Sequence, residues 1–178
     1  MFEVEFDVLE GLEPYALEEI RACCGRACSP VALYPGRIRV RFAGDLRALL
    51  RLRSVVAAYL IVTYDVPRPR ALLGHQHLTR LLTTLKLVRS LTKPEYYRTL
   101  RLSAAGSDSS VMTRLKETLA AHTGLALADD EGDLLIRRAA QSRTAAGKYW
   151  CDCRHARWQP APGACVTGPA RSTPPSRR

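Results

Sequence analysis

The first part of the chain alternates between the apolar patterns of strands and of helices. Over residues 2–8 aromatic and aliphatic residues alternate with acidic ones, which is the two-residue period of a half-buried strand. Over residues 12–24 the apolar positions recur at helical spacing, with Pro14 in the first turn and Gly25 placed to end the helix. The pattern therefore predicts a strand followed by a helix.

Two further strands and a short helix complete this first unit. Residues 31–34 and 38–42 read as strands joined by a type II turn at Pro35-Gly36, and the second of them has one apolar and one cationic face. Asp45 is placed to cap a helix that runs to about Arg53. The β-branched and aromatic residues 55–66 indicate a fourth strand. This order is the split βαβ arrangement of a ferredoxin-like domain, which we predict for residues 1–66.

A second unit is predicted for residues 67–138. A leucine stripe indicates a helix over residues 75–90, and a strand follows at 96–103. A second helix begins at Asp108 or Ser109 and ends at Gly124, and two short strands flank an acidic turn. These two strands are expected at residues 125–128 and 134–138, paired as a hairpin. The unit is a small α/β domain.

The last forty residues have a different composition. Residues 139–178 contain no Leu, Ile, Phe or Met, so they cannot bury enough apolar area to offset the entropy of ordering them. We expect a disordered, dispensable tail, and its composition favours translation out of frame over a natural basic tail. The predicted fold class is α+β: a ferredoxin-like domain, a small α/β domain and this tail.

The net charge of +10 is concentrated in the middle of the chain. Residues 36–128 contain sixteen Lys and Arg against five Asp and Glu, which favours an anionic partner, nucleic acid ahead of a membrane surface. No apolar run approaches the roughly 20 residues of a membrane helix, and the acidic start has no basic segment of a secretory signal. We therefore expect no membrane partner, a cytoplasmic location and reduced cysteines.

Several segments together resemble a known family. In the second unit they are the leucine-striped helix, Tyr97–Ser103, Asp108–Lys116 and Gly124–Arg137, and in the first unit Gly11–Ile20 and Gly36–Arg41. The second unit resembles a THUMP domain, and the first is similar to the ferredoxin-like domain that precedes THUMP. The combination looks most like the front half of a guanine-N2 methyltransferase acting on tRNA or ribosomal RNA.

The methyltransferase domain that follows in that family has no counterpart in this sequence. Its glycine-rich S-adenosylmethionine loop is missing, and Pro174-Pro175 lacks both the preceding Asn or Asp and the following aromatic residue of the catalytic motif. The four histidines are scattered, and none has a nucleophile or carboxylate at a spacing that would indicate a catalytic site. We predict a truncated relative that binds no cofactor and is not an enzyme.

RNA binding is the predicted function of the second unit. Backbone N–H groups at a helix start attract phosphate, and nearby hydroxyl and guanidinium groups can donate hydrogen bonds to it. The resemblance implies that the RNA is the acceptor end of tRNA, whereas Tyr96 and Tyr97 are expected in the core rather than stacked on bases. The residues expected to bind RNA are Arg80, Lys86, Arg89, Arg98, Arg101, Ser107, Ser109, Ser110, Arg114 and Lys116.

Two alternatives compete with this interpretation. Cys151, Cys153, His155 and Cys165 could ligate zinc, but a single residue separates the first two cysteines where zinc knuckles usually have two or more, so no metal is predicted. The rival function is a protein-interaction or small-ligand regulatory domain on a ferredoxin-like fold, whose basic surface would meet an acidic partner.

Overall fold

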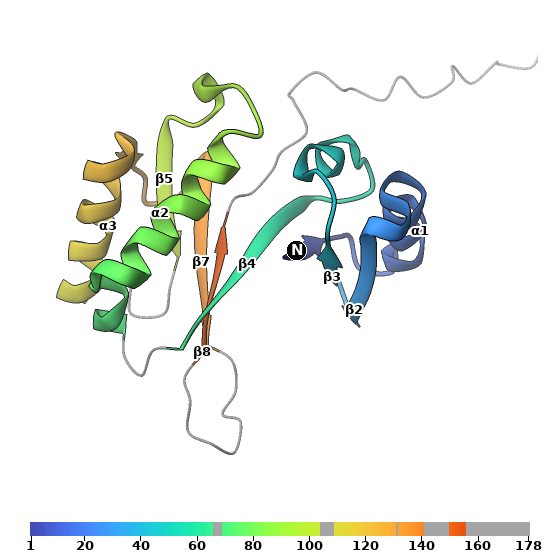
Figure 1. Cartoon of the computed structure of the whole chain (residues 1–178), viewed down its shortest axis with the longest axis horizontal. Coiled ribbons are helices and arrows are strands. Elements are labelled where there is room, and N and C mark those ends of the chain that lie inside the picture. The colour runs from blue at the N-terminus through green and yellow to red at the C-terminus, as the bar shows by residue number, and fades with distance from the viewer. Residues whose placement is uncertain (66–68, 104–108, 131, 141–149, 156–178) are drawn as a thin grey trace, which may run out of the picture.

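The strands of the protein form one continuous sheet in the computed structural model, which describes residues 1–65, 69–103, 109–130, 132–140 and 150–155 (Figure 1). The order across the sheet is β2-β3-β1-β4-β8-β7-β5-β6. The strands are β1 (Phe2–Asp7), β2 (Cys28–Tyr34), β3 (Arg37–Phe42), β4 (Ala57–Asp65), β5 (Thr99–Ser103), β6 (Ala126–Leu127), β7 (Leu134–Ala140) and β8 (Trp150–His155).

Within the described residues, three α-helices and four short 3-10 helices accompany the sheet, which confirms the predicted α+β class. The α-helices are α1 (Glu13–Cys24), α2 (His75–Arg89) and α3 (Ser110–Thr123), and the 3-10 helices are η1 (Gly25–Ala27), η2 (Leu46–Arg51), η3 (Pro69–Leu73) and η4 (Pro94–Tyr96).

The first four strands have the predicted ferredoxin-like arrangement. β3 lies between β1 and β2 and is antiparallel to both, and β4 pairs antiparallel with the other side of β1. The connection from β3 to β4 is the 3-10 helix η2 rather than an α-helix. As predicted, Asp45 caps it: its Oδ1 accepts a hydrogen bond from the Arg47 N–H at 2.9 Å.

The register of β1 separates an apolar face from a charged one. Val4 pairs with Val40 of β3, and Phe6 with Ile38; all four side chains are completely buried. α1 packs on this face through Ala16 and Ile20. Because successive strand residues point to opposite faces, the acidic residues of β1 lie on the other face.

β4 carries the apolar face into the second half of the sheet. Leu60 lies level with Val4, and Tyr64, four residues along the same strand, lies on the same face. The Tyr64 ring meets the His77 ring of α2 edge-on, with centroids 5.8 Å apart. α1 and α2 therefore pack on the same face of the sheet.

The predicted hairpin of the second unit is wrong. β6 and β7 do not pair with each other but flank β5, and both run parallel to it. The connection between them crosses over β5. There the Asp133 carboxylate accepts hydrogen bonds from the N–H groups of Arg98 and Thr99 and from the Thr99 hydroxyl, at 2.9–3.0 Å. These hydrogen bonds to the start of β5 fix the connection between β6 and β7, as a tight turn would fix a hairpin.

The helices of the second half match the predicted apolar stripes. Leu81, Leu85 and Val88 of α2 are buried against the sheet, and so are three positions of α3 at the same spacing. Gly124 ends α3 in the left-handed conformation, with φ of 70°, as the sequence predicts.

Part of the predicted disordered tail is a strand. Residues 139 and 140 complete β7, and β8 pairs antiparallel with β4 on one side and with β7 on the other. An inner strand is held by backbone hydrogen bonds on both sides, which do not require apolar side chains. The rest of the tail, residues 141–149 and 156–178, lies outside the described residues. Through β8 the two predicted units, 1–66 and 67–138, share one sheet.

Candidate nucleic-acid interface

One edge of the sheet collects the ends of three strands and the starts of two helices. β5 and β7 are parallel, and β8 is antiparallel to both β7 and β4, so β4, β5 and β7 all end at the same edge. The chain leaves β4 into η3 and α2, and leaves β5 toward α3. The N-termini of α2 and α3 therefore lie at this edge (Figure 1).

Neither helix start is neutralised by the part of the chain that the structure describes. The N-cap residues are Gly74 for α2 and Ser109 for α3; neither helix has a side-chain cap, and neither has an acidic residue in its first turn. The first N–H groups of each helix lack acceptors inside the helix, and the helix dipole is positive at this end. Such an arrangement favours an anion.

Three exposed arginines lie close to these helix starts. Arg80, on the second turn of α2, lies over the Tyr64 ring with its guanidinium carbon 5.3 Å from the centroid, and its Nη1 donates to the Thr63 carbonyl at 3.1 Å. Arg114 occupies the second turn of α3, and Arg70 belongs to η3. We call Arg70, Arg80, Ser109, Ser110 and Arg114 the helix-start edge.

The structure places only part of the predicted RNA-binding set at this edge. Arg80, Ser109, Ser110 and Arg114 belong to it, whereas Lys116 is half-buried in the middle of α3. Ser107 lies outside the described residues. Arg70 was missed by the sequence reasoning, because its only signal was a charge in a proline-containing linker.

The other predicted cations lie elsewhere. Lys86 and Arg89 are in the last turn of α2, and Arg98 directly precedes β5, so all three lie toward the opposite end. Arg89 has a structural contact, since its Nη1 donates to the carbonyl of Thr123 at the end of α3, at 2.9 Å. Arg101 lies on the face of β5 that the connection between β6 and β7 crosses, against Gly132.

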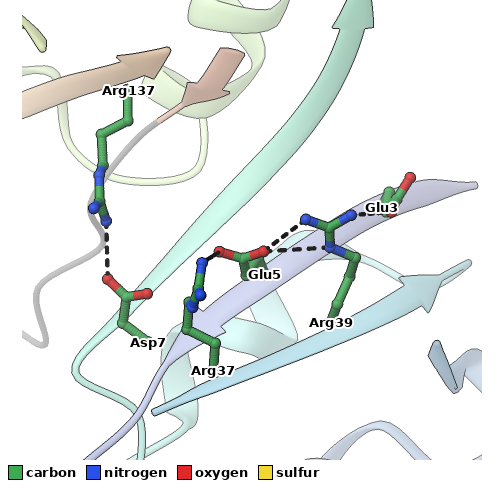
Figure 2. A network of polar contacts seen from close by, with 6 residues as sticks. All are labelled: Glu3, Glu5, Asp7, Arg37, Arg39 and Arg137. Carbon is green, nitrogen blue, oxygen red and sulfur yellow. Dashed lines mark hydrogen bonds and ion pairs between the residues drawn. The ribbon is translucent and has the colours of Figure 1, made fainter. Parts of the chain in front are cut away.

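A separate network occupies the charged face of β1 (Figure 2). Arg39 binds the buried Glu5 carboxylate through Nη2 at 2.9 Å and Nε at 3.3 Å, and its Nη1 lies 3.6 Å from Glu3. Arg37 lies 4.0 Å from the same Glu5 carboxylate. The cationic face of β3 is thus paired with the acidic face of β1, which leaves Arg37 and Arg39 less available to a phosphate.

The same network reaches the second half of the sheet. Arg137 of β7 lies 3.3 Å from Asp7 of β1, and its guanidinium carbon is 5.6 Å from the centroid of the Tyr59 ring (Figure 2). Burial raises the pKa of Tyr59, and the nearby Asp7 charge adds to the shift. Arg137 therefore ties the two halves of the sheet together.

The described residues contain neither a cluster of metal ligands nor a helix of membrane-spanning length. Among the side chains that it describes, no three His, Cys, Asp or Glu are placed to hold a metal ion. The candidates Cys151, Cys153 and His155 are positions of β8, and Cys165 lies outside the described residues. Burial, with the nearby Cys28 and Cys23, raises the pKa of the Cys24 thiol to about 11. No helix in the described ranges is long and apolar enough to cross a bilayer.

Comparison with known proteins places the fold. The sequence matches no protein-family profile and no curated protein. Among solved structures, TrmN from Thermus thermophilus superimposes on 89% of this chain and 47% of its own, with 18% identity and a TM-score of 0.52. A possible methylase from Clostridium difficile 630 covers 86% of this chain and 41% of its own, with 13% identity and a TM-score of 0.42. The chain thus has the fold of a part of TrmN and spans less than half the length of either protein.

Proposed function

We propose that this chain is the RNA-binding part of a THUMP-containing, methyltransferase-like protein, and that its helix-start edge holds the phosphates at the acceptor end of a tRNA. The 178 residues bind RNA and do not themselves transfer a methyl group. The proposal depends on one observation above all: two helix N-termini without a side-chain cap among the described residues lie at one edge of the sheet with the exposed Arg80 and Arg114.

The electrostatics of the described residues support a phosphate ligand at that edge. Arg37, Arg39 and Arg137 have carboxylate partners within 4.0 Å, whereas Arg80 and Arg114 have none among the described residues. Bringing phosphate to these two arginines therefore breaks no ion pair among the described residues. A guanidinium beside free backbone N–H groups is a common way for proteins to bind phosphate.

The fold and the sequence support the same class of protein. The chain shares its fold with part of TrmN, and its helix and strand motifs resemble those of a THUMP domain preceded by a ferredoxin-like domain. The sequence contains no glycine-rich S-adenosylmethionine loop, which is the basis for proposing RNA binding without catalysis. Incubating the chain with tritiated S-adenosylmethionine and tRNA should leave the RNA unlabelled.

A paired substitution tests the location of the site. Replacing Arg80→Ala together with Arg114→Ala should weaken tRNA binding about tenfold or more, since about 1.4 kcal/mol is a factor of ten and each charge-assisted contact contributes about that much. The matched control, Arg26→Ala with Arg41→Ala, removes the same charge from two exposed positions in the first unit. It should cost several-fold less, as measured by electrophoretic mobility shift and by fluorescence anisotropy at fixed salt.

Three outcomes would count against the proposal. Equal losses from the two pairs would mean diffuse electrostatic attraction and no site at the helix-start edge. A tRNA affinity that does not change with salt concentration would argue against phosphate contacts. Each phosphate contact should contribute about −0.7 to the slope of log affinity against log salt concentration for single strands. No binding of tRNA by the wild-type chain would favour the rival function, a protein-interaction or small-ligand regulatory domain.

A further inference from the structure

Two neighbouring tyrosines after α2 have opposite environments. Tyr97 is only 6% exposed, as expected of a core residue, but Tyr96 is 51% exposed, contrary to the expectation that it would be buried. An exposed aromatic ring gains nothing from the core of its own protein. Its flat face remains available to a ligand.

The backbone around Tyr96 is fixed. Its own N–H donates to the Lys93 carbonyl at 3.1 Å within η4. Two residues later, the Arg98 N–H donates to the Asp133 carboxylate at 2.9 Å, and the Arg98 carbonyl accepts from the Ala126 N–H at 3.0 Å. The buried Tyr97 lies between these two anchors, so Tyr96 is presented on a preorganised loop.

Several exposed cations belong to this loop or lie next to it in the chain. Lys93 and Arg98 are exposed on either side of Tyr96, and Lys86 is exposed on the last turn of α2. From the first half of the sheet, Arg47 reaches the same loop, and its Nη2 lies 3.4 Å from the Ser90 carbonyl. Glu95 of this loop is exposed, and the Asp133 carboxylate is engaged with the backbone N–H groups of Arg98 and Thr99.

We infer that Tyr96 is a stacking platform for an unpaired RNA base, and that Lys93 and Arg98 hold the phosphates on either side of it. An aromatic face between cations is the usual way in which proteins bind single strands without reading their sequence. This inference rests on the proposed function and adds a second contact, separate from the helix-start edge. The 15 residues of α2 put about 22 Å between the two ends of that helix.

Substitution of the ring tests the inference on the full chain. Tyr96→Ala should weaken the binding of a short single-stranded RNA about 5- to 100-fold, the range found when one base–aromatic stack is removed. Tyr96→Phe retains the ring and should bind within about twofold of wild type. Tyr15→Ala, which removes a 68% exposed ring from α1, should leave affinity unchanged. An oligonucleotide with one abasic site should lose affinity for wild type but little for Tyr96→Ala.

The possible results separate the two proposals. If Tyr96→Ala binds RNA as wild type does, or if the Phe variant loses as much as the Ala variant, the stacking platform is wrong. A loss from Tyr15→Ala equal to that from Tyr96→Ala would also overturn it. If Arg80→Ala with Arg114→Ala still weakens tRNA binding in those cases, the proposed function stands alone. If no variant changes binding, or the wild-type chain binds no RNA, both are overturned.

Discussion

At the scale of single residues, several carboxylates of this protein hold loops through hydrogen bonds. Glu13 accepts the N–H groups of Gly11 and Gly36 and so joins the loop before α1 to the turn between β2 and β3. Glu19 of α1 accepts the Arg53 N–H and the N–H and hydroxyl of Ser54. For Glu19, burial raises the pKa, but these hydrogen bonds outweigh it and the pKa is lowered. Such residues look like free surface charges in a sequence, and only the structure shows their partners.

Asp133 is the clearest case and gives a test by pH. Burial raises its pKa, but the hydrogen bonds from Arg98 and Thr99 outweigh that effect, so the pKa lies below the usual value. A carboxylate with a lowered pKa stabilises the fold above its unfolded pKa of about 3.9, and that stabilisation disappears as the pH falls through the folded value. Asp133→Asn should lower the unfolding free energy by about 1 kcal/mol at pH 7, because solvent screens the interactions of an exposed carboxylate.

The measurement is urea unfolding of wild type and Asp133→Asn at pH 7 and near pH 3. The difference in unfolding free energy should shrink at the lower pH. Asp129→Asn, in the same connection, is the matched control and should change neither value by more than about 0.5 kcal/mol. A difference that stays constant with pH would show that the Asp133 charge does not carry the effect.

At the scale of elements, the periodicity of apolar residues predicted those features that depend on residues close together in the sequence. The stripes of α1, α2 and α3, the cap at Asp45 and the ferredoxin-like strand order all follow from spacing and turn residues. The failures concern pairing across distance. Residues 125–138 have the pattern of a hairpin, but their partner is β5, and no local signal records that Asp133 binds the start of that strand.

The crossing of β5 depends on a close approach at Gly132. A Cβ added there would lie 2.8 Å from the Cβ and 3.0 Å from the backbone nitrogen of Arg101. Neither atom can move without shifting β5, so Gly132→Ala should lower the unfolding free energy by about 1–3 kcal/mol. Asp130→Ala, two residues away and exposed, should cost no more than about 0.5 kcal/mol in the same thermal or urea measurement. Equal stability of the two variants would mean that the connection relaxes freely.

At the scale of the whole molecule, the candidate site was only half predictable. The sequence singled out the cations of the second unit, but strand order decides which of them share an edge. That order places Arg80 and Arg114 together and sends Lys86 and Arg98 to the other end. β8 has almost none of the apolar pattern of a strand. For that reason its composition predicted a disordered tail, although β8 is the strand that joins the two halves of the sheet.

The position of β8 predicts where the chain can be shortened. The sequence suggested that everything after Arg138 is dispensable, but β8 lies between β4 and β7 and pairs with both. A chain ending at His155 should keep a single cooperative thermal transition, whereas one ending at Arg138 should unfold at lower temperature and with less cooperativity. Calorimetry would check this through the ratio of calorimetric to van't Hoff enthalpy. Identical transitions for the two chains would contradict the role assigned to β8.

The inner position of β8 also affects how the protein emerges during synthesis. β4 ends at Asp65, but its partner β8 begins only at Trp150, so about 85 residues must be translated before that side of β4 can be paired. At about 5–20 residues per second this leaves the strand edge open for roughly 4–17 seconds. An unpaired strand edge can pair with another chain. The nascent protein therefore has a time window for misassembly that closes only when β8 has been synthesised.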